Sequence, residues 1–142
     1  MPIFSTRGGN KGAHGRYLRD YPILVDRLLS KHSRDEAMLA AVGGDDRLGG
    51  TLLSVLDRIG FRDGAYLIDV GCGSGRLTRR IAQLPNARYL GTDVSGKMLT
   101  YAMETSQRPD FLFKLVDSTI IPEADNMADF VSFFFGRNAY AQ

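Results

Sequence analysis

A continuous apolar strand that runs into a glycine-rich turn constrains this 142-residue chain more than any other feature. Residues 65–70 read Ala-Tyr-Leu-Ile-Asp-Val, which is typical of a strand covered on both faces. Residues 71–75 follow as Gly-Cys-Gly-Ser-Gly, and glycine at every second position lets the backbone turn sharply and leaves room for a ligand. Because this turn lies between a buried strand and the start of a helix, it predicts a ligand-binding loop.

Strands and helices alternate along the second half of the chain. We expect strands over residues 65–70, 88–93, 111–116 and 128–135, with helices over residues 76–84 and from the N-cap Ser95. This order predicts an α/β fold: a partial Rossmann-like parallel sheet in strand order 3-2-1-4, with right-handed crossovers. Ligands of such sheets bind beyond the carboxyl ends of the strands, where the strand order reverses.

The residues before the sheet are expected to form a helical cap. Residues 1–16, with four glycines among basic and polar residues, are predicted to be a flexible basic arm. Residues 17–60 are predicted to hold the cap and a leading helix, and residues 61–142 the ligand-binding half domain. Within the cap we expect a helix over 17–30 broken at Pro22, one over 34–42, and one that Asp45 or Asp46 caps.

Charge and composition limit the other classes of function. Residues 1–34 hold seven Lys/Arg against two Asp, although the whole chain carries only +2. A solvated basic arm is the simpler interpretation, and a surface for an anionic acceptor or RNA is the alternative. We find no nucleic-acid motif, no apolar run of the roughly 20 residues that span a membrane, and no zinc-ligand spacing. We therefore expect no membrane partner, no metal and a cytoplasmic location, and we disfavour nucleic acid without excluding it.

Two aspartates flank the glycine turn. The second strand ends at Asp93, 22 residues after Gly71, where a carboxylate can accept hydrogen bonds from both hydroxyls of a ribose. The alternative is that Asp93 caps the next helix, but Ser95 is better placed for that role. Asp69, two residues before the first glycine, suits a ligand with a positive ammonium group.

The turn is less suited to a dinucleotide. An NAD-binding turn needs a third glycine where this sequence has Arg76, so that the helix N-terminus can receive a pyrophosphate. S-adenosylmethionine has an ammonium group, a ribose and an adenine but no phosphate, and it fits the residues of this sequence better.

Three segments resemble the class I S-adenosylmethionine-dependent methyltransferases. Residues 67–75 look like motif I of that superfamily, and residues 89–95 (Tyr-Leu-Gly-Thr-Asp-Val-Ser) are similar to its post-I segment. Residues 115–118 and 127–131 resemble the segment from the third strand to the fourth. The resemblance covers residues 65–135.

The resemblance implies a role for each candidate site residue. Asp69 and the loop would hold the methionine end of the cofactor, Asp93 would bind the ribose hydroxyls, and Val94 with Met98 would pack on the adenine. Core packing is an equal alternative for Met98, and Cys72 is expected to be a small spacer rather than a nucleophile. Asp117, with Ser118 beside it, would accept a hydrogen bond from the adenine amino group. The full set of cofactor-binding candidates is Asp69, Val70, Gly71, Cys72, Gly73, Ser74, Gly75, Asp93, Val94, Met98, Asp117, Ser118 and Phe134.

The implied activity is methyl transfer from S-adenosylmethionine to an undetermined acceptor. The fourth strand lacks the Asp/Asn-Pro-Pro-aromatic signature of many DNA and protein amino-group methyltransferases, which favours a small-molecule acceptor. No catalytic base can be named, although His14, Tyr17 and Tyr21 are candidates in the cap. A non-catalytic cofactor-binding or regulatory module, and less favourably an NAD-dependent oxidoreductase, are the alternatives.

The chain also departs from the family's pattern after Phe134. The resemblance implies a helix and three further strands beyond the fourth strand. We therefore expect a fragment, or a chain that needs a partner or a second copy at the exposed fourth-strand edge, which is rich in phenylalanine at residues 133–135.

Overall fold

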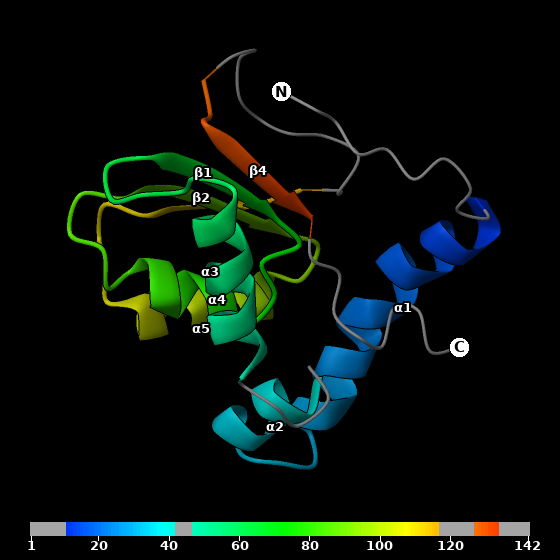
Figure 1. Ribbon diagram of the computed structural model, residues 1–142. Coiled ribbons are helices and arrows are strands. Elements are labelled where there is room, and N and C mark those ends of the chain that lie inside the picture. The colour runs from blue at the N-terminus through cyan, green and yellow to red at the C-terminus, as the bar shows by residue number, and fades with distance from the viewer. Residues whose placement is uncertain (1–10, 42–46, 117–126, 134–142) are drawn as a thin grey trace.

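The computed structural model describes residues 11–41, 47–116 and 127–133, and every structural statement below concerns these residues (Figure 1). Among them, no helix is long and apolar enough to cross a membrane.

A four-stranded parallel sheet forms the centre of the protein. Its strands are β1 (Tyr66–Val70), β2 (Arg88–Asp93), β3 (Leu112–Leu115) and β4 (Phe130–Phe133), in the order β3-β2-β1-β4. The predicted Rossmann-like sheet in 3-2-1-4 order is therefore confirmed. Asp69 on β1 lies opposite Gly91 on β2 and Ser132 on β4, so these three residues share one face of the sheet.

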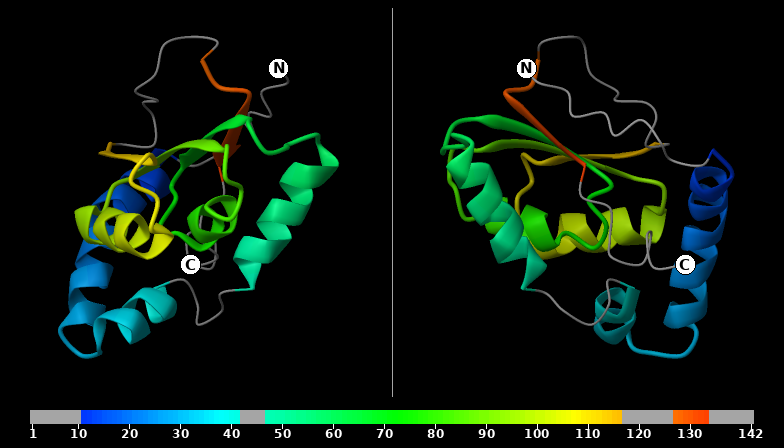
Figure 2. Two further views of the ribbon diagram at one scale, coloured as in Figure 1. Left: turned by 90° about the vertical axis from the view of Figure 1, so that its left-hand side faces the viewer. Right: turned by 45° about the vertical axis from the view of Figure 1, so that its right-hand side comes forward.

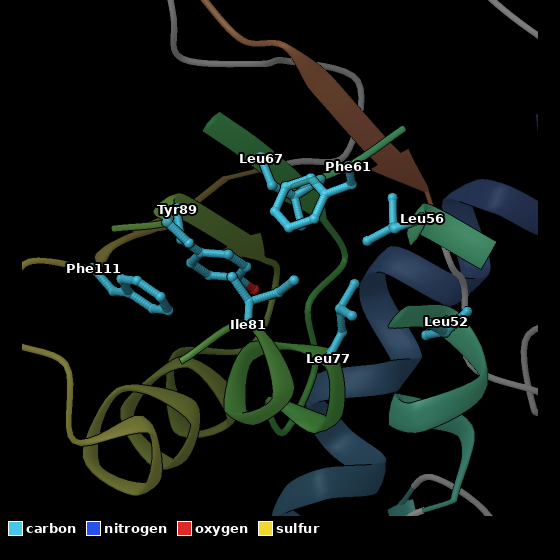
Figure 3. Close-up of a cluster of buried hydrophobic side chains, with 9 residues drawn as sticks. Leu52, Leu56, Phe61, Leu67, Leu77, Ile81, Tyr89 and Phe111 are labelled. Carbon is cyan, nitrogen blue, oxygen red and sulfur yellow. The ribbon is translucent and has the colours of Figure 1, made fainter. Parts of the chain in front are cut away.

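Three helices lie along that face of the sheet: α3 (Leu48–Arg58), α4 (Arg76–Ile81) and α5 (Gly96–Ser106) (Figures 1 and 2). Apolar side chains of α3 and α4 meet those of β1 and β2 in a buried cluster (Figure 3). Its centre is the Tyr89 ring, which stacks on Phe111 with ring centroids 4.9 Å apart. The buried residues of the cluster are Leu52, Leu56, Phe61, Leu67, Leu77, Ile81, Ala87, Tyr89 and Phe111. This core fixes the sheet against α4, the helix that follows the glycine turn.

The helices α1 (Lys11–Leu29) and α2 (Arg34–Ala41) form a hairpin to one side of the sheet (Figures 1 and 2). The hairpin packs on α5 through a second buried cluster of Val25, Met38, Ala41 and Met98. An ion pair between Asp26 and Lys97 and a hydrogen bond from Tyr101 to Asp35 add polar contacts. The predicted helical cap therefore exists, and it is attached to the helix that follows β2.

Two details of the predicted cap were wrong. The first helix begins at Lys11, inside the predicted flexible arm, and it continues through Pro22 without a break. A glycine in a helix costs only about 1 kcal/mol, which is small beside the packing of Val25 and its neighbours on α2 and α5. Proline removes one backbone donor, and the contacts that follow it hold the helix together. The division of the chain into arm, cap and half domain otherwise stays a prediction.

The predicted N-cap residue of the third helix, Asp45 or Asp46, was also wrong. The N-cap of α3 is Arg47, which makes no side-chain capping bond, whereas Asp45 and Asp46 lie outside the described residues. Instead, the backbone at the start of α3 lies in close contact with the backbone of α4. A Cβ at Gly49 would lie 2.4 Å from the carbonyl oxygen of Arg76, so only glycine lets α3 pack this closely on α4. The start of α3 is thus marked by its packing on α4 and not by a capping side chain.

The loops at the amino ends of β2 and β3 are tied together by Arg108. Its guanidinium donates to the carbonyl oxygens of Leu84 at 2.8 Å and Ala87 at 3.2 Å, in the loop before β2. It also forms an ion pair with Asp110, at 2.8 Å, and lies over the ring of Phe111. Before β1, Asp63 accepts hydrogen bonds from the backbone and side-chain amides of Asn86. At the amino ends of the strands, side chains of the protein therefore bind the loops to one another.

Candidate cofactor-binding site

The glycine turn lies at the carboxyl end of β1. Gly71, Gly73 and Gly75 have φ angles of 74°, 58° and 89°, in the left-handed region that side chains disfavour. The amides of Gly71 and Cys72 both donate to the carbonyl oxygen of Thr92, at 2.8 and 2.9 Å. These bonds fix the turn over the end of β2, and α4 begins directly after Gly75.

The glycines differ in what surrounds them. A Cβ at Gly75 would lie 2.8 Å from the Cβ of Ala102 on α5, and one at Gly91 would lie 3.0 Å from the sulfur of Cys72. These two positions are closed by packing. At Gly73, no atom of the described residues lies within 4 Å of the place that a Cβ would take, so the space beside this residue is open. A ligand can therefore approach the backbone of the turn at Gly73.

Asp93 binds the turn from the end of β2. Its Oδ2 accepts a hydrogen bond from the amide of Gly73 at 2.9 Å, and its Oδ1 accepts one from the amide of Ser95 at 2.9 Å. Burial raises the pKa of Asp93 above its ordinary value, while the amides of Ser95, Gly73 and Val94 act in the opposite direction. Ser95 itself caps α5 by accepting from the amide of Met98, as the sequence predicts.

Asp69 is the more deeply buried carboxylate, with only 2% of its surface exposed. Its Oδ1 accepts from the hydroxyl of Ser132 and its Oδ2 from the hydroxyl of Tyr89, each at 2.8 Å. Burial raises the pKa of Asp69 to about 6, the two hydroxyls lower it, and the charge of Asp93 raises it. The two carboxylates thus lie on the same face of the sheet and interact electrically.

Sequence reasoning did not identify Tyr89 and Ser132 as site residues. A signal was present, because Tyr89 is two residues before Gly91 and Ser132 is a single polar residue among the apolar residues of the fourth strand. Hydroxyls on the same face of neighbouring strands can reach a carboxylate of the middle strand. Finding them required the register of three strands, which the sequence alone did not supply.

The structure brings most of the predicted turn residues together, but it buries one of the candidates for the adenine contact in the core. Met98 is fully buried in the cluster between α1, α2 and α5, which is the packing alternative, whereas Val94 is half-buried. Burial raises the pKa of the Cys72 thiol, which favours the expected spacer over a nucleophile. Asp117, Ser118 and Phe134 lie outside the described residues, as do the side chains of His14 and Tyr17.

Two acidic side chains, Asp69 and Asp93, lie at the site, and one guanidinium contacts the turn, since Arg79 donates to the carbonyl oxygen of Ser74 at 2.7 Å. No Lys or Arg in the described part of the chain forms an ion pair with Asp69 or Asp93. Within the same ranges, no group of three or more His, Cys, Asp and Glu is placed to hold a metal ion. An organic cation with hydroxyl groups is the ligand chemistry that these two carboxylates suit.

Comparisons with known proteins agree with this geometry. A family described as "methyltransferase domain" matches residues 67–141, slightly more than half of the chain. A putative methyltransferase, 235L, of Invertebrate iridescent virus 6 is 32% identical over 81 residues, which are 56% of this chain and 29% of the viral protein.

Two solved structures share the fold. One is a putative methyltransferase in complex with the Trm112 methyltransferase activator of Haloferax volcanii, with a TM-score of 0.59 and 25% identity over 79% of this chain and 45% of that one. The other is magnesium protoporphyrin IX methyltransferase of Synechocystis PCC 6803 with bound S-adenosylmethionine, with a TM-score of 0.52 and 18% identity over 78% of this chain and 57% of that one.

The chain spans less than a third of the viral relative and less than half of the archaeal structure that it matches. The matched family, the strand order and the glycine turn between two strand-end aspartates all lead to the same conclusion. The chain belongs to the class I S-adenosylmethionine-dependent methyltransferase superfamily.

Proposed function

We propose that this chain binds S-adenosylmethionine at the glycine turn and serves in methyl transfer to a small-molecule acceptor. The observation that carries the proposal is the pair of buried carboxylates, Asp69 and Asp93, which face the turn without a cationic partner among the described residues. S-adenosylmethionine carries a sulfonium and an ammonium against one carboxylate, so its net positive charge complements the pair. A similar fold holds this cofactor in the protoporphyrin methyltransferase.

The residues present fit the cofactor. An ionised carboxylate offers about four acceptor positions, so Asp93 can bind ribose hydroxyls in addition to the two amides that it already accepts. The open space at Gly73 gives the cofactor access to the backbone. Val94 is half-buried beside Asp93 and remains our candidate for the adenine contact, together with Asp117, Ser118 and Phe134.

Asp69 has a different proposed role. Because its two oxygens already accept from Ser132 and Tyr89, we propose that it acts on the methionine end mainly through its charge and through the position of the turn. The backbone of the turn, from Gly71 to Gly75, would then lie nearest to this end of the cofactor, whereas the side chain of the predicted Val70 is fully buried on the opposite face of the sheet from Asp69.

When bound, the cofactor would supply a methyl group on a sulfonium: the acceptor nucleophile bonds to the methyl carbon in line with the breaking carbon–sulfur bond, and the sulfur leaves with the electron pair as S-adenosylhomocysteine. The protein's part is to align the two reactants, which is worth roughly 7–11 kcal/mol of the barrier in well-oriented systems. Asp93 and the turn fix the donor side of this alignment. We assign no catalytic base. The fourth strand (Phe130–Phe133) lacks the signature of many DNA and protein amino-group methyltransferases, which favours a small-molecule acceptor.

A protein partner is the second part of the proposal. Among the described strands, β4 and β3 are the edges of the sheet, and Phe133 on β4 is 48% exposed. We propose that a further strand pairs with β4, because exposed edge strands offer unpaired backbone groups. Size measurements with and without S-adenosylmethionine would test this, and a monomer at every concentration would count against pairing between copies.

Calorimetry tests the cofactor directly. We expect S-adenosylmethionine to bind and NAD not to bind, and Asp93→Ala to reduce the affinity at least tenfold because it removes the ribose acceptor. Asp63→Ala is the matched control, since Asp63 also accepts a backbone amide but at the opposite edge of the sheet. Preferential binding of NAD, or equal losses in the two variants, would refute the assignment.

A transfer assay separates an enzyme from a binding module. Incubation with methyl-labelled S-adenosylmethionine and a panel of small nucleophiles should label one class of acceptor, and Asp93→Ala should abolish the label. Cofactor binding without any transfer would favour the non-catalytic regulatory alternative.

A further inference from the structure

Beneath the glycine turn, a chain of hydrogen bonds ends on Asp69. The hydroxyls of Thr78 on α4 and Tyr89 on β2 are 2.7 Å apart, and Tyr89 donates to Asp69. From the other side, Ser132 on β4 donates to the second oxygen of the same carboxylate. All four residues are at most 3% exposed.

With Asp69 ionised, the direction of each of these bonds is settled. Tyr89 has a single hydroxyl proton and gives it to Asp69, so Thr78 must donate its own proton to the oxygen of Tyr89. Three hydroxyl protons therefore point, directly or in sequence, toward one carboxylate. A proton on Asp69 would change these directions: the carboxyl would donate to one of the two hydroxyls, and if that hydroxyl were Tyr89, Tyr89 would turn its own proton toward Thr78.

The surroundings hold the Tyr89 hydroxyl in place. The ring stacks on Phe111 within the buried cluster (Figure 3). It also lies against the partly buried Phe113, with ring centroids 5.8 Å apart. The titratable groups that act on Asp69 are Tyr89, Asp93 and the Cys72 thiol, whereas α4 and β4 contribute only neutral hydroxyls. None of these groups is a cation, so within the described ranges hydrogen bonds, and no positive charge, support the ionised form of Asp69.

We propose that Tyr89 is a positioning residue that keeps Asp69 ionised beneath the glycine turn, so that protonation of Asp69 weakens the binding of the cationic cofactor. This inference rests on the proposed function of the site. Burial brings the pKa of Asp69 to about 6, so the carboxylate changes charge within a range that cells and assays reach. A proton on Asp69 removes one of the two negative charges that complement S-adenosylmethionine.

The test is the pH dependence of S-adenosylmethionine affinity between pH 5 and pH 8. The parent protein should lose affinity as the pH falls below about 6. In Tyr89→Phe, which keeps the stacked ring, the loss should begin about one pH unit higher, because the ionised carboxylate has lost a donor. Ser132→Ala should shift the profile in the same direction, and Asp69→Asn should bind weakly with a shallower dependence on pH, the remainder coming from Asp93, whose pKa burial also raises.

Thr92→Val is the matched control. The Thr92 hydroxyl is also buried on β2, but it has no hydrogen-bond partner among the described residues and lies on the opposite face of the sheet from Tyr89. This variant should keep the parent's profile. If Tyr89→Phe fails to fold, Ser132→Ala decides the question.

A second measurement separates this inference from the proposed function. Carboxyl carbon-13 NMR of the ligand-free protein reads the pKa of Asp69, which should rise in Tyr89→Phe and not in Thr92→Val. If the parent binds S-adenosylmethionine but Tyr89→Phe shares its pH profile, the role of Tyr89 is overturned and the proposed function stands. If the parent binds none at any pH, the proposed function fails and the coupling fails with it, whatever the NMR titration shows.

Discussion

Charged side chains of opposite sign bind the backbone at the two ends of the sheet. We call these ends the amino edge, where the strands begin, and the carboxyl edge, where they end. At the amino edge, the guanidinium of Arg108 donates to backbone carbonyls of the loop before β2. At the carboxyl edge, Asp93 accepts from backbone amides of Gly73 and Ser95, and Asp69 accepts from two hydroxyls. A cation thus donates hydrogen bonds to several acceptors at the amino edge, and two carboxylates accept hydrogen bonds from several donors at the carboxyl edge.

The edges differ in whether that charge is compensated. Arg108 has Asp110 as its partner, whereas neither buried carboxylate has a cationic partner in the described ranges. Burying a charge without a partner costs stability, and such groups are concentrated at functional sites. The amino edge thus compensates its own charge, whereas the carboxyl edge carries the features on which the proposed binding of a positively charged ligand rests.

The largest expected effect comes from changing the shape of the carboxyl edge. Gly75→Ala places a Cβ 2.8 Å from Ala102 at a φ of 89°. Left-handed backbone and overpacking together should lower the free energy of unfolding by about 3–4 kcal/mol. Urea unfolding measures the loss.

Gly96→Ala provides the comparison for that variant. Gly96 follows the N-cap of α5, and a Cβ there would meet no atom of the described residues within 4 Å. Alanine at this position should leave stability unchanged or raise it by up to about 1 kcal/mol. Equal losses in the two variants would show that the turn is not the constrained part of this edge.

The charge of the carboxyl edge should make stability depend on pH. The pKa of Asp69 is raised from 3.8 to about 6 in the folded protein, so the folded state holds this proton more tightly than the unfolded state. The contribution of this group to the free energy of unfolding is therefore greatest below about pH 4. It is lost as the pH rises to about 6, by about 3 kcal/mol in all.

Asp69→Asn isolates that contribution. Denaturant unfolding at several pH values between 4 and 7.5 should give a clear slope for the parent and a shallower one for the variant. A parent whose stability rises over the same range would mean that Asp69 is not the dominant titrating group of the fold.

Substitutions at the amino edge should change the stability of the fold but not the affinity for S-adenosylmethionine. Arg108→Met removes donors from several carbonyls and should lower the free energy of unfolding by about 2 kcal/mol. The affinity for S-adenosylmethionine, measured on the folded variant, should stay within about twofold. Arg62→Met is the control, since Arg62 also binds carbonyl oxygens but its side chain is 66% exposed. A large loss of affinity in Arg108→Met would contradict the separation of the two edges.

The carboxyl edge was also the part that the sequence predicted best. The turn, the strand-end Asp93 and the N-cap Ser95 are defined by neighbours along the chain, so local patterns identify them. The partners of Asp69 come from strands on both sides of β1, and their contact depends on the register of the sheet. Similarly, α1 passes through Pro22 because of packing against α2 and α5, which no local pattern reports.

The smallest expected effect lies on the face of the sheet opposite Asp69. Thr92 is 1% exposed and its hydroxyl has no hydrogen-bond partner in the described part of the chain, so the fold bears the cost of burying a polar atom there. Thr92→Val replaces that hydroxyl by a methyl group of similar shape and should raise the free energy of unfolding by about 1 kcal/mol. If thermal unfolding shows a loss instead, the hydroxyl has a partner in solution. In that case the face opposite the two carboxylates would hold no unsatisfied buried polar atom in the described part of the chain, and Thr92 would belong to the satisfied scaffold of the sheet.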